Sequence, residues 1–350
     1  MASPAAARLT DLLDGTRALA LVGLAKNTGK TVTLAAILAE HAAVGRTVGV
    51  TSIGRDGEEH DVIDARIDKP AVTLQAGSLV ATTGGLLRAS GLAHERLAQT
   101  GVRTPLGEVV LARISEPGAL EVAGPSAAAD VRAVSEQMAA LGAEQVLIDG
   151  AIDRRAASSP AVADGLVMAT GAILGEDIED VVSATSDAVE LVRLPAADDA
   201  DREQPTRTDA DAERITLDRS AVLGAEPAAI AAVLREHPRA RVLVVEGALG
   251  ERYLEGLLAA RRERAGRELR IVVGDPTRVF LSRRGPRWYA RQGVSIEVLR
   301  RIELRAITVN PVAPQSHSFD SRALRESIES AVSDVPVLDV LDPSYLALAK

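Results

Sequence analysis

A short loop that ends in Gly29-Lys30-Thr31 has the clearest chemistry in this sequence. An apolar run over residues 19–22 leads into the loop at Gly23, and an Ala/Leu-rich stretch over residues 32–41 follows it. A strand that ends in such a loop directs backbone N–H groups at phosphate oxygens, and the positive end of the following helix faces the same anion. The pattern therefore predicts a site for nucleotide phosphates.

Two side chains of this loop would act on the phosphates and on their metal ion. The Lys30 ammonium would reach the β- and γ-phosphates, and the Thr31 hydroxyl would bind Mg²⁺. The spacing is unusual, because Gly23 lies one residue too far from Gly29 for the common G-x-x-x-x-G-K-[ST] pattern. Leu24 stands where that glycine is expected. We therefore predict a variant P-loop.

Carboxylates at strand ends are the next candidates, since γ-phosphoryl transfer needs a metal ion, a positioned nucleophile and stabilisation of charge. Asp149 follows a run of apolar residues and precedes Gly150-Ala151, where the chain can turn beside the phosphates. The alternative for Asp149 is a helix N-cap. Glu246 ends a strand in the same way. Either could be the acid that holds Mg²⁺, and Asp149 ranks first because Glu246 lies beyond a charged segment.

Three more polar residues occupy positions that a nucleotide site would use. Asp56, in the charged loop after the second predicted strand, could hold Mg²⁺ through water or orient water, although such loops are more often only solvated. Lys26, inside the phosphate loop, could pair with the triphosphate or reach a neighbouring subunit's nucleotide, and is equally a solvated lysine. Asn310 could read a base edge through its amide, and the alternative is that it completes a turn.

The elements that must position these residues alternate between strands and helices. This alternation favours an α/β fold, a mainly parallel sheet with helices on both faces. Strands are predicted over residues 19–22, 47–53, 146–148, 165–170, 241–245, 269–273, 306–309 and 337–340, with one or two short strands within 71–83, and helices over 32–41 and 131–141. Residues 108–114 and 119–122 flank Ser115-Glu116-Pro117-Gly118 and predict an antiparallel hairpin.

A polar and charged segment over residues 195–213 divides the chain. We expect a P-loop domain over residues 1–194, a linker or exposed loop over 195–213, and a second α/β lobe over 214–350 that could complete the same sheet. Four aromatic residues fall in one stretch of this lobe, residues 253–289, where core filling suits them better than a partner-binding surface: Tyr253, Phe280, Trp288 and Tyr289.

Composition excludes several classes of protein. The chain of 350 residues has a net charge of −9, which disfavours nucleic-acid binding. It lacks an apolar run of the roughly 20 residues that a membrane span needs, and its start lacks the pattern of a signal peptide. It has no cysteine and so no disulfide framework. We expect a soluble cytoplasmic protein without nucleic-acid or membrane partners.

The spacing from glycine to Gly-Lys-Thr resembles the dethiobiotin-synthetase branch of P-loop proteins, which includes MinD-like and cobyric-acid-synthase-like members. Strand-end acids followed by Gly-Ala and the late Asn310-Pro311-Val312 turn are similar too. In dethiobiotin synthetase the second strand typically ends in a Lys-Pro pair that handles the substrate, and this chain has Ser52-Ile53-Gly54 there.

A second resemblance covers nearly the whole chain, to the ATPase subunit of the reactivase for cobalamin-dependent lysine 5,6-aminomutase. The blocks that carry it are GLAKNTGKT at 23–31, TSIGRDGE at 51–58, LIDGAIDR at 147–154, ADGLVMATGA at 163–172, GDPTRVF at 274–280 and TVNPVAP at 308–314. The resemblance implies an ATP-driven chaperone that works with a MutS-like partner subunit. It would remove damaged cobalamin from the aminomutase so that intact adenosylcobalamin can enter.

This resemblance implies ATP and Mg²⁺ as cofactors and an ATPase site made by Lys30, Asp149 and Asp56, with Thr31, Asp149 and Asp56 holding Mg²⁺. Nucleotide contacts would come from the loop, the start of the helix and one distant residue: Gly23, Lys26, Asn27, Thr28, Gly29, Lys30, Thr31, Thr33 and Asn310. Members of this P-loop class commonly dimerise with nucleotide at the interface, so the resemblance also implies a homodimer.

Two other functions remain open. One is an ATP-dependent ligase or kinase of the dethiobiotin type, whose turnover would require a small acceptor molecule. The other is a nucleotide-gated binding module with negligible turnover. A reactivase would instead hydrolyse ATP slowly and speed up when the mutase and its partner are added.

Overall fold

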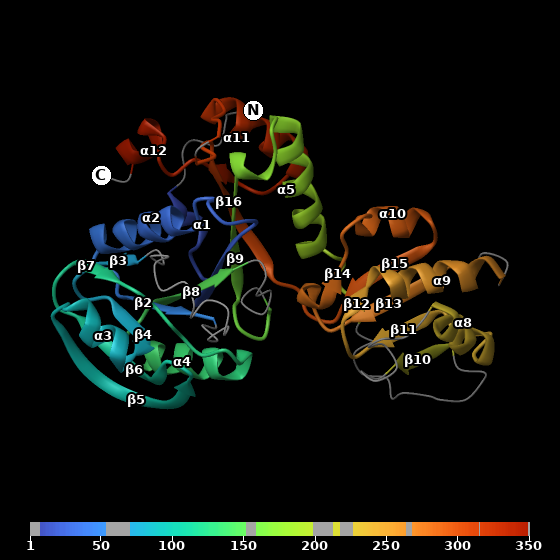
Figure 1. The fold of residues 1–350 in the computed structure, drawn as a ribbon, viewed down its shortest axis with the longest axis horizontal. Helices are drawn as coiled ribbons and strands as arrows, with labels where there is room; N and C mark the ends of the chain where they lie inside the picture. Colours follow the sequence, from blue (N-terminus) through green and yellow to red (C-terminus); the bar gives the residue numbers. More distant parts are fainter. Residues whose placement is uncertain are drawn as a thin grey trace. The chain divides into compact units, whose positions relative to one another are not determined.

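The computed structural model of the chain describes residues 8–53, 71–151, 159–198, 213–217, 227–263, 268–314 and 316–348. Internal contacts divide the chain into two compact units (Figure 1). The first consists of Met1–Ser186 and Ile302–Lys350, and the second of Asp187–Arg301. The division therefore falls at residues 186 and 302 and not at the charged segment 195–213, because the end of the chain returns to the sheet of the first unit.

The first unit is built on a nine-stranded sheet with the order β17-β16-β9-β1-β8-β2-β4-β6-β5. Its strands are β1 (Ala18–Gly23), β2 (Val48–Ser52), β4 (Leu79–Thr83), β5 (His94–Thr104), β6 (Gly107–Ile114), β8 (Gln145–Ala151), β9 (Gly165–Gly171), β16 (Glu303–Asn310) and β17 (Val337–Leu338). All neighbours from β17 to β4 pair in parallel, and β6 pairs antiparallel with both β4 and β5. The predicted α/β fold with a large, mainly parallel sheet is confirmed.

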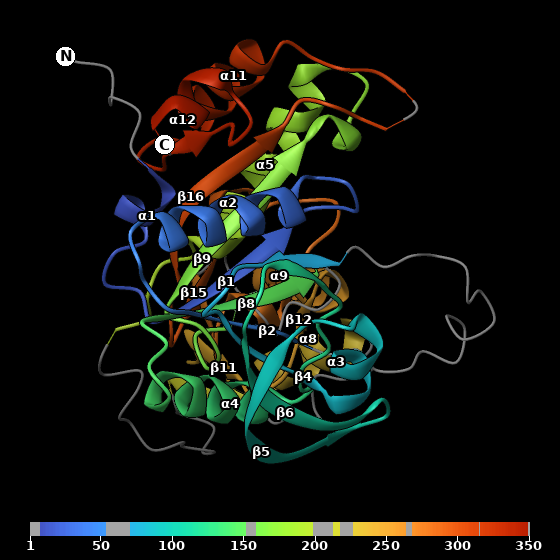
Figure 2. The same ribbon diagram turned by 90° about the vertical axis from the view of Figure 1, so that its left-hand side faces the viewer.

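Helices lie on both faces of this sheet, as Figure 2 shows for α2 and α4. The helices of the first unit are α1 (Leu9–Leu12), α2 (Lys30–Ala43), α3 (Gly84–Ser90), α4 (Ala128–Ala140), α5 (Ile178–Val192), which runs into the second unit, the short η2 (Ala172–Leu174), α11 (Ser321–Val332) and α12 (Pro343–Leu348). Strand β2 separates the two faces: Val48 and Val50 pack in one core with Ile37 of α2. A Cβ on Gly49, between them, would lie 3.0 Å from the Met138 sulfur of α4.

The predicted hairpin of residues 108–114 with 119–122 is wrong. Strand β6 pairs with β5 across a connection in which Thr104 lies opposite Gly107, and Gly107 has a φ of 119°. Residues 118–120 form β7 (Gly118–Leu120), which pairs antiparallel with β3 (Val72–Leu74) in a separate sheet. Both edges of β6 are already taken by β4 and β5, so no edge is left for the following segment.

The second unit has its own four-stranded parallel sheet, in the order β10-β11-β13-β15. Its elements are β10 (Arg214–Leu217), α8 (Pro227–Glu236), β11 (Val242–Val245), β12 (Leu249–Gly250), α9 (Glu251–Glu263), β13 (Leu269–Val273), η3 (Pro276–Arg278), β14 (Val279–Phe280), α10 (Pro286–Arg291) and β15 (Val294–Val298). Strands β12 and β14 form a separate parallel pair. Tyr253 and Tyr289 are buried in the core of this unit, as expected for core filling, whereas Phe280 is 48% exposed.

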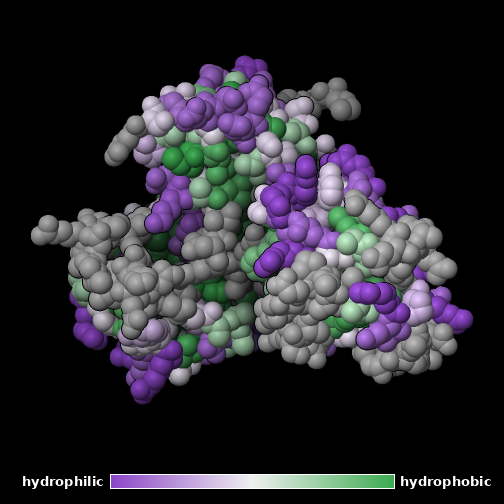
Figure 3. Space-filling model, turned by 45° about the vertical axis from the view of Figure 1, so that its right-hand side comes forward, coloured by the Kyte–Doolittle hydropathy of each residue, from purple (hydrophilic) through white to green (hydrophobic). Residues whose placement is uncertain are grey.

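Charged side chains dominate parts of the surface. Hydrophilic residues gather over the top of the view in Figure 3, where α11 lies. This helix carries the ion pairs Arg322–Glu326 and Arg325–Glu329, each one helical turn apart. Within the described residues, no helix combines the length and apolarity needed to cross a membrane.

Candidate phosphate-binding site

The predicted phosphate loop lies where the strand order of the large sheet reverses. From β1 the chain passes through α2 to β2 on one side, and after β8 it crosses to β9 on the other side of β1. Open α/β sheets bind ligands outside the carboxyl ends of their strands at such a switch point. The loop over residues 24–29 leaves β1 there, with β8 and β9 as its two neighbouring strands.

The start of the loop explains its unusual spacing. Leu24 N–H donates to Ala169 O of β9 over 2.9 Å, which extends the pairing of β1 by one residue beyond Gly23. The Thr28 hydroxyl is buried and donates back to Ala25 O over 3.0 Å. A Cβ on Gly23 would lie 2.6 Å from the Thr28 hydroxyl oxygen, so the tight fold of the loop requires glycine at this position.

The end of the loop leaves backbone donors free. Gly29 adopts a left-handed conformation with a φ of 88° and is the N-cap of α2, with no side-chain hydrogen bond from the cap. The first backbone bond of the helix runs from Thr33 N–H to Gly29 O at 2.9 Å. In the described part of the chain, the N–H groups of Gly29, Lys30 and Thr31 have no acceptor. Free N–H groups at a helix start are the donors that bind phosphate.

Lys30, the first residue of α2, forms an ion pair with Asp149 of β8. Alternate residues of a strand share a face. Leu147 packs in the core under α2, so Asp149 faces α2 as well. Both side chains keep access to solvent, with 22% and 26% of their surfaces exposed. Asp149 pairs with Leu21 of β1 and with Ser52 of β2, so it lies inside a strand and is not a helix N-cap.

Strand β16 brings two further side chains to the loop from the distant end of the sequence. Ala306 packs in the core under α2, so Thr308 and Asn310 share its face. The Thr308 and Thr33 hydroxyls are 2.7 Å apart, and Thr33 also donates to Gly29 O at 3.2 Å. Thr28 and Thr33 are both buried, and their hydroxyls bond to Ala25 O and Gly29 O and so stabilise the loop. Thr308 is not among the residues predicted for this site. Its spacing of two from Asn310 would place both side chains on one face of a strand, which is the signal that the sequence contains.

Both ends of the Asn310 amide are engaged by backbone. Its nitrogen donates to Asn27 O over 2.7 Å, and its oxygen accepts from Val312 N–H at 3.1 Å. A Cβ on Gly29 would lie 3.1 Å from the Asn310 Cβ, so the two segments touch. These bonds match the turn interpretation of Asn310 and add a contact to the phosphate loop.

The remaining predicted residues fall into three groups. Lys26 and Asn27 are exposed on the loop, and Thr31 is partly exposed, with no hydrogen-bond partner for its hydroxyl among the residues described. Asp56 lies outside the described residues. Glu246 follows β11 in the second unit, and its carbonyl accepts from Arg278 at 2.9 Å. The first unit thus joins Lys30, Thr31 and Asp149 at one sheet edge without Glu246.

The residues present suit a phosphate group and a divalent cation. Free N–H groups and the Lys30 ammonium are donors for phosphate oxygens. A hydroxyl and a carboxylate are oxygen ligands of the kind that Mg²⁺ uses beside nucleotide phosphates. The fold and the site together define a mainly parallel α/β protein with a Gly-Lys-Thr loop at its switch point. No protein-family model, curated protein or solved structure matches the chain.

Proposed function

We propose that the first unit is a Mg²⁺-ATP-binding P-loop ATPase. The observation that carries this proposal is the placement at the switch point, beside Asp149, of Lys30 and of the α2 N-terminal N–H groups that have no acceptor among the described residues. Lys30 would bind the β- and γ-phosphates, and Thr31 and Asp149 would hold Mg²⁺. Asp56 and Lys26 remain candidates for orienting water and for a second cation.

The ion pair between Lys30 and Asp149 would compete with a bound nucleotide for Lys30. In the structure, the ammonium and the carboxylate contact each other. A triphosphate would attract Lys30 through its much larger negative charge, and Asp149 would then be available to a cation. Mg²⁺, when bound, would neutralise charge on the phosphates. Exchange of partners by Lys30 would thus couple phosphate binding to metal binding.

The finer proposal is that ATP binding and hydrolysis reactivate an adenosylcobalamin-dependent aminomutase, together with a MutS-like partner subunit, by releasing damaged cobalamin. Its support is the sequence resemblance and the location of the matching blocks. Five of the six overlap strands of the nine-stranded sheet, namely β1, β2, β8, β9 and β16, and the sixth follows β13 in the second unit. A homodimer with nucleotide at its interface is part of this proposal.

Calorimetric titration of Mg²⁺-ATP into the Lys30→Ala variant tests the binding proposal. Loss of the charge-assisted bonds of Lys30 should raise the dissociation constant at least about tenfold. Arg132→Ala is the matched control, because Arg132 is an exposed cation of the same unit whose pair is Glu136 on its own helix. Unchanged affinity in Lys30→Ala, with the variant folded by circular dichroism, would overturn the proposal.

ATP turnover with and without candidate partners separates the finer functions. A reactivase should hydrolyse ATP slowly alone and faster when the aminomutase carrying an inactive corrinoid and the partner subunit are added. Release of that corrinoid, followed by its absorbance, should accompany hydrolysis. Turnover that requires a small acceptor would instead indicate a ligase or kinase, and nucleotide binding without turnover would indicate a binding module.

A further inference from the structure

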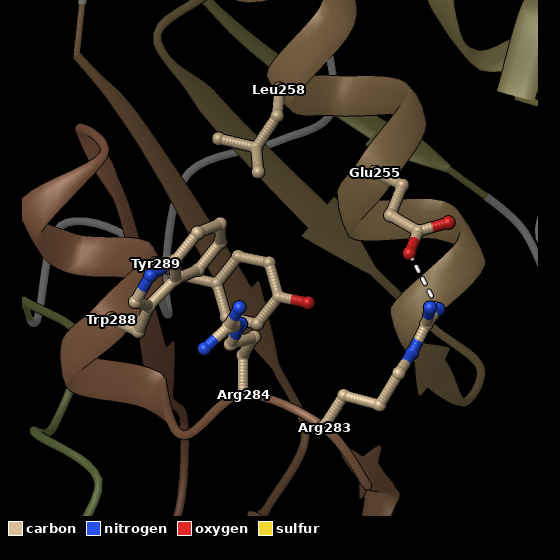
Figure 4. Close-up of a pocket in the computed structure, with 6 residues that line it drawn as sticks. All are labelled: Glu255, Leu258, Arg283, Arg284, Trp288 and Tyr289. Carbon is tan, nitrogen blue, oxygen red and sulfur yellow. Dashed lines mark hydrogen bonds and ion pairs between the residues drawn. The ribbon is translucent and has the colours of Figure 1, made fainter.

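A second candidate site lies entirely within the second unit, between α9 and the segment from β14 to α10. A cavity of about 540 Å³ opens there. Figure 4 shows the six residues that line it: Glu255, Leu258, Arg283, Arg284, Trp288 and Tyr289. Small-molecule sites commonly have volumes of about 300–1,000 Å³ and combine apolar walls with a few polar groups. The P-loop proposal uses none of these residues.

The two arginines of this cavity differ in their partners. Arg283 is neutralised by acids of α9: its guanidinium pairs with Glu255 at 2.6 Å and with Glu251 at 3.3 Å. The Arg284 guanidinium has no carboxylate partner among the residues that the structure describes. It lies 5.2 Å from the centre of the Trp288 ring, in a cation–π contact. Among the described residues, Arg284 is therefore the arginine of this lining whose guanidinium is not already held by a carboxylate, and it is open to the anion of a ligand.

The backbone holds Arg284 in place. Glu251 is only 10% exposed, and it accepts from the N–H groups of Arg283 at 2.6 Å and Arg284 at 3.2 Å. These bonds fix the segment before α10, while the Arg284 side chain itself stays exposed. An anion could thus bind Arg284 without any rearrangement of the backbone.

The other side of the lining consists of one aliphatic and two aromatic side chains, Leu258, Trp288 and Tyr289. Trp288 and Tyr289 meet edge to face with their ring centres 5.0 Å apart, and Leu258 projects from α9 toward them (Figure 4). Trp288 is partly exposed, whereas Tyr289 is buried. Such walls favour a planar, apolar body. Arg287 and Arg291 follow within α10, but Glu190, Glu251 and Glu255 bond to the same segment and offset most of this positive charge, so the pairing with an anion depends on Arg284 itself.

We propose that this cavity binds a small organic anion that carries a flat ring. Arg284 pairs with the carboxylate or phosphate of the ligand, and the ring lies against Leu258, Trp288 and Tyr289. Arg283, held by Glu251 and Glu255, forms the wall beside them. The second unit is then a ligand-binding unit in its own right, separate from the nucleotide site of the first unit.

Trp288 is the only tryptophan in the sequence, so its fluorescence reports directly on this cavity. Four probes are titrated into the full chain: phenyl phosphate, benzoate, inorganic phosphate and benzyl alcohol. Excitation at the red edge of indole absorption avoids light absorption by the probes themselves. Phenyl phosphate or benzoate should give a saturable change, because each combines an anion with a ring. Inorganic phosphate and benzyl alcohol, which each have one feature only, should need at least about tenfold higher concentrations.

Arg284→Gln should raise the dissociation constant of phenyl phosphate at least about tenfold, because the guanidinium supplies the charge-assisted bonds. Arg291→Gln is the matched control, an exposed arginine of the same segment outside the cavity lining, and should leave binding unchanged. Lys30→Ala should also leave it unchanged. The proposal would be overturned if benzyl alcohol bound as tightly as phenyl phosphate, or if no probe gave a saturable change. It would also be overturned if Arg284→Gln bound phenyl phosphate normally, if the two arginine variants lost equal affinity, or if Lys30→Ala lost affinity.

Discussion

Asn310 donates a hydrogen bond of 2.7 Å from its side-chain amide to the backbone carbonyl of Asn27, although the two residues are 283 positions apart in the chain. Asn27 has a left-handed φ of 66°, a conformation that asparagine adopts more readily than most other residues except glycine. The bond from Asn310 of β16 thus adds to a local preference of the loop for this conformation. Residues beyond the inserted second unit therefore belong to the candidate phosphate-binding site.

Asn310→Ala should weaken nucleotide binding without abolishing it. The variant loses one hydrogen bond that shapes the loop, a net loss of about 1 kcal/mol, which corresponds to roughly fivefold in the dissociation constant of Mg²⁺-ATP. Calorimetric titration measures this change. Val312→Ala is the control, because Val312 lies in the same turn but is 51% exposed and donates to Asn310 only through its backbone. If both variants bound equally tightly, the Asn310 bond would have no part in shaping the site.

Asp149→Asn should separate ATP binding from ATP hydrolysis. The amide keeps the size of the side chain but removes the charge that pairs with Lys30 and that would hold Mg²⁺. Nucleotide should still bind, because Lys30 and the free N–H groups remain. Hydrolysis of Mg²⁺-ATP should fall by about a hundredfold or more, in line with the loss of charge stabilisation at other phosphoryl-transfer sites. Turnover at the wild-type rate would show that Asp149 has no role in ATP hydrolysis.

The sequence contained enough to predict the strand, the loop and the helix around residues 19–41, because their signal is local. A strand, a glycine, Gly29-Lys30-Thr31 and a helix follow one another within a few residues, and each local preference agrees with the fold. The acid at residue 149 was also recognisable, since a buried strand that ends in an acid and small residues is a local pattern. Parallel strands then place separate strand ends at one edge of the sheet.

Non-local pairing could not be predicted in the same way. Residues 108–114 form a strand as expected, but their partner is β5, because strand pairing depends on which edges are free in the assembled sheet. The return of β16 to the first unit, and with it the contacts of Thr308 and Asn310, depends on the pairing of β16 with β9 across the inserted unit. The composition of the charged segment 195–213 suggested a domain boundary there. The boundaries between the two units instead follow from which residues contact one another, and they fall at residues 186 and 302.

Tyr345→Phe should destabilise the first unit through a buried polar network. The Tyr345 hydroxyl accepts from Leu9 N–H at 3.1 Å and donates to Glu40, a carboxylate only 3% exposed. Glu40 also accepts from the N–H and hydroxyl of Thr10, each at 3.0 Å. Removing the hydroxyl leaves a buried carboxylate oxygen and a buried N–H without this partner, a loss of about 1–3 kcal/mol.

Thermal unfolding followed by circular dichroism measures the effect of Tyr345→Phe, with Phe319→Leu as a comparison in which a ring is removed outside this network. The Tyr345 variant should unfold at a lower temperature. An unchanged unfolding temperature would mean that water satisfies Glu40 and Leu9 equally well. The network ties α1, α2 and α12 together, so its loss should also expose both ends of the chain to proteolysis.

Glu251→Gln should destabilise the second unit in a pH-dependent way. Burial raises the pKa of Glu251, but hydrogen bonds from Ser282 and from the backbone N–H groups of residues 282–284 outweigh it and lower the pKa from 4.5 to about 2. Because the pKa is lower in the folded state, the ionised carboxylate stabilises the fold above pH 4.5, and this contribution is lost as the pH falls from 4.5 toward 2.

Urea unfolding followed by Trp288 fluorescence tests this at pH 7 and at pH 3, since Trp288 packs against the core of the second unit. At pH 7, Glu251→Gln should lower the free energy of unfolding by about 1.5–3 kcal/mol, the range for hydrogen bonds to a charged group. Glu255→Gln is the control: Glu255 is 48% exposed and its ion pair in the described part of the chain is with the exposed Arg283, so its loss should cost at most about 1 kcal/mol. The difference between wild type and Glu251→Gln should shrink at pH 3, because the carboxylate is then protonated in the unfolded chain and must release that proton on folding. A difference that stays constant between the two pH values would mean that the size of the side chain matters here and its charge does not.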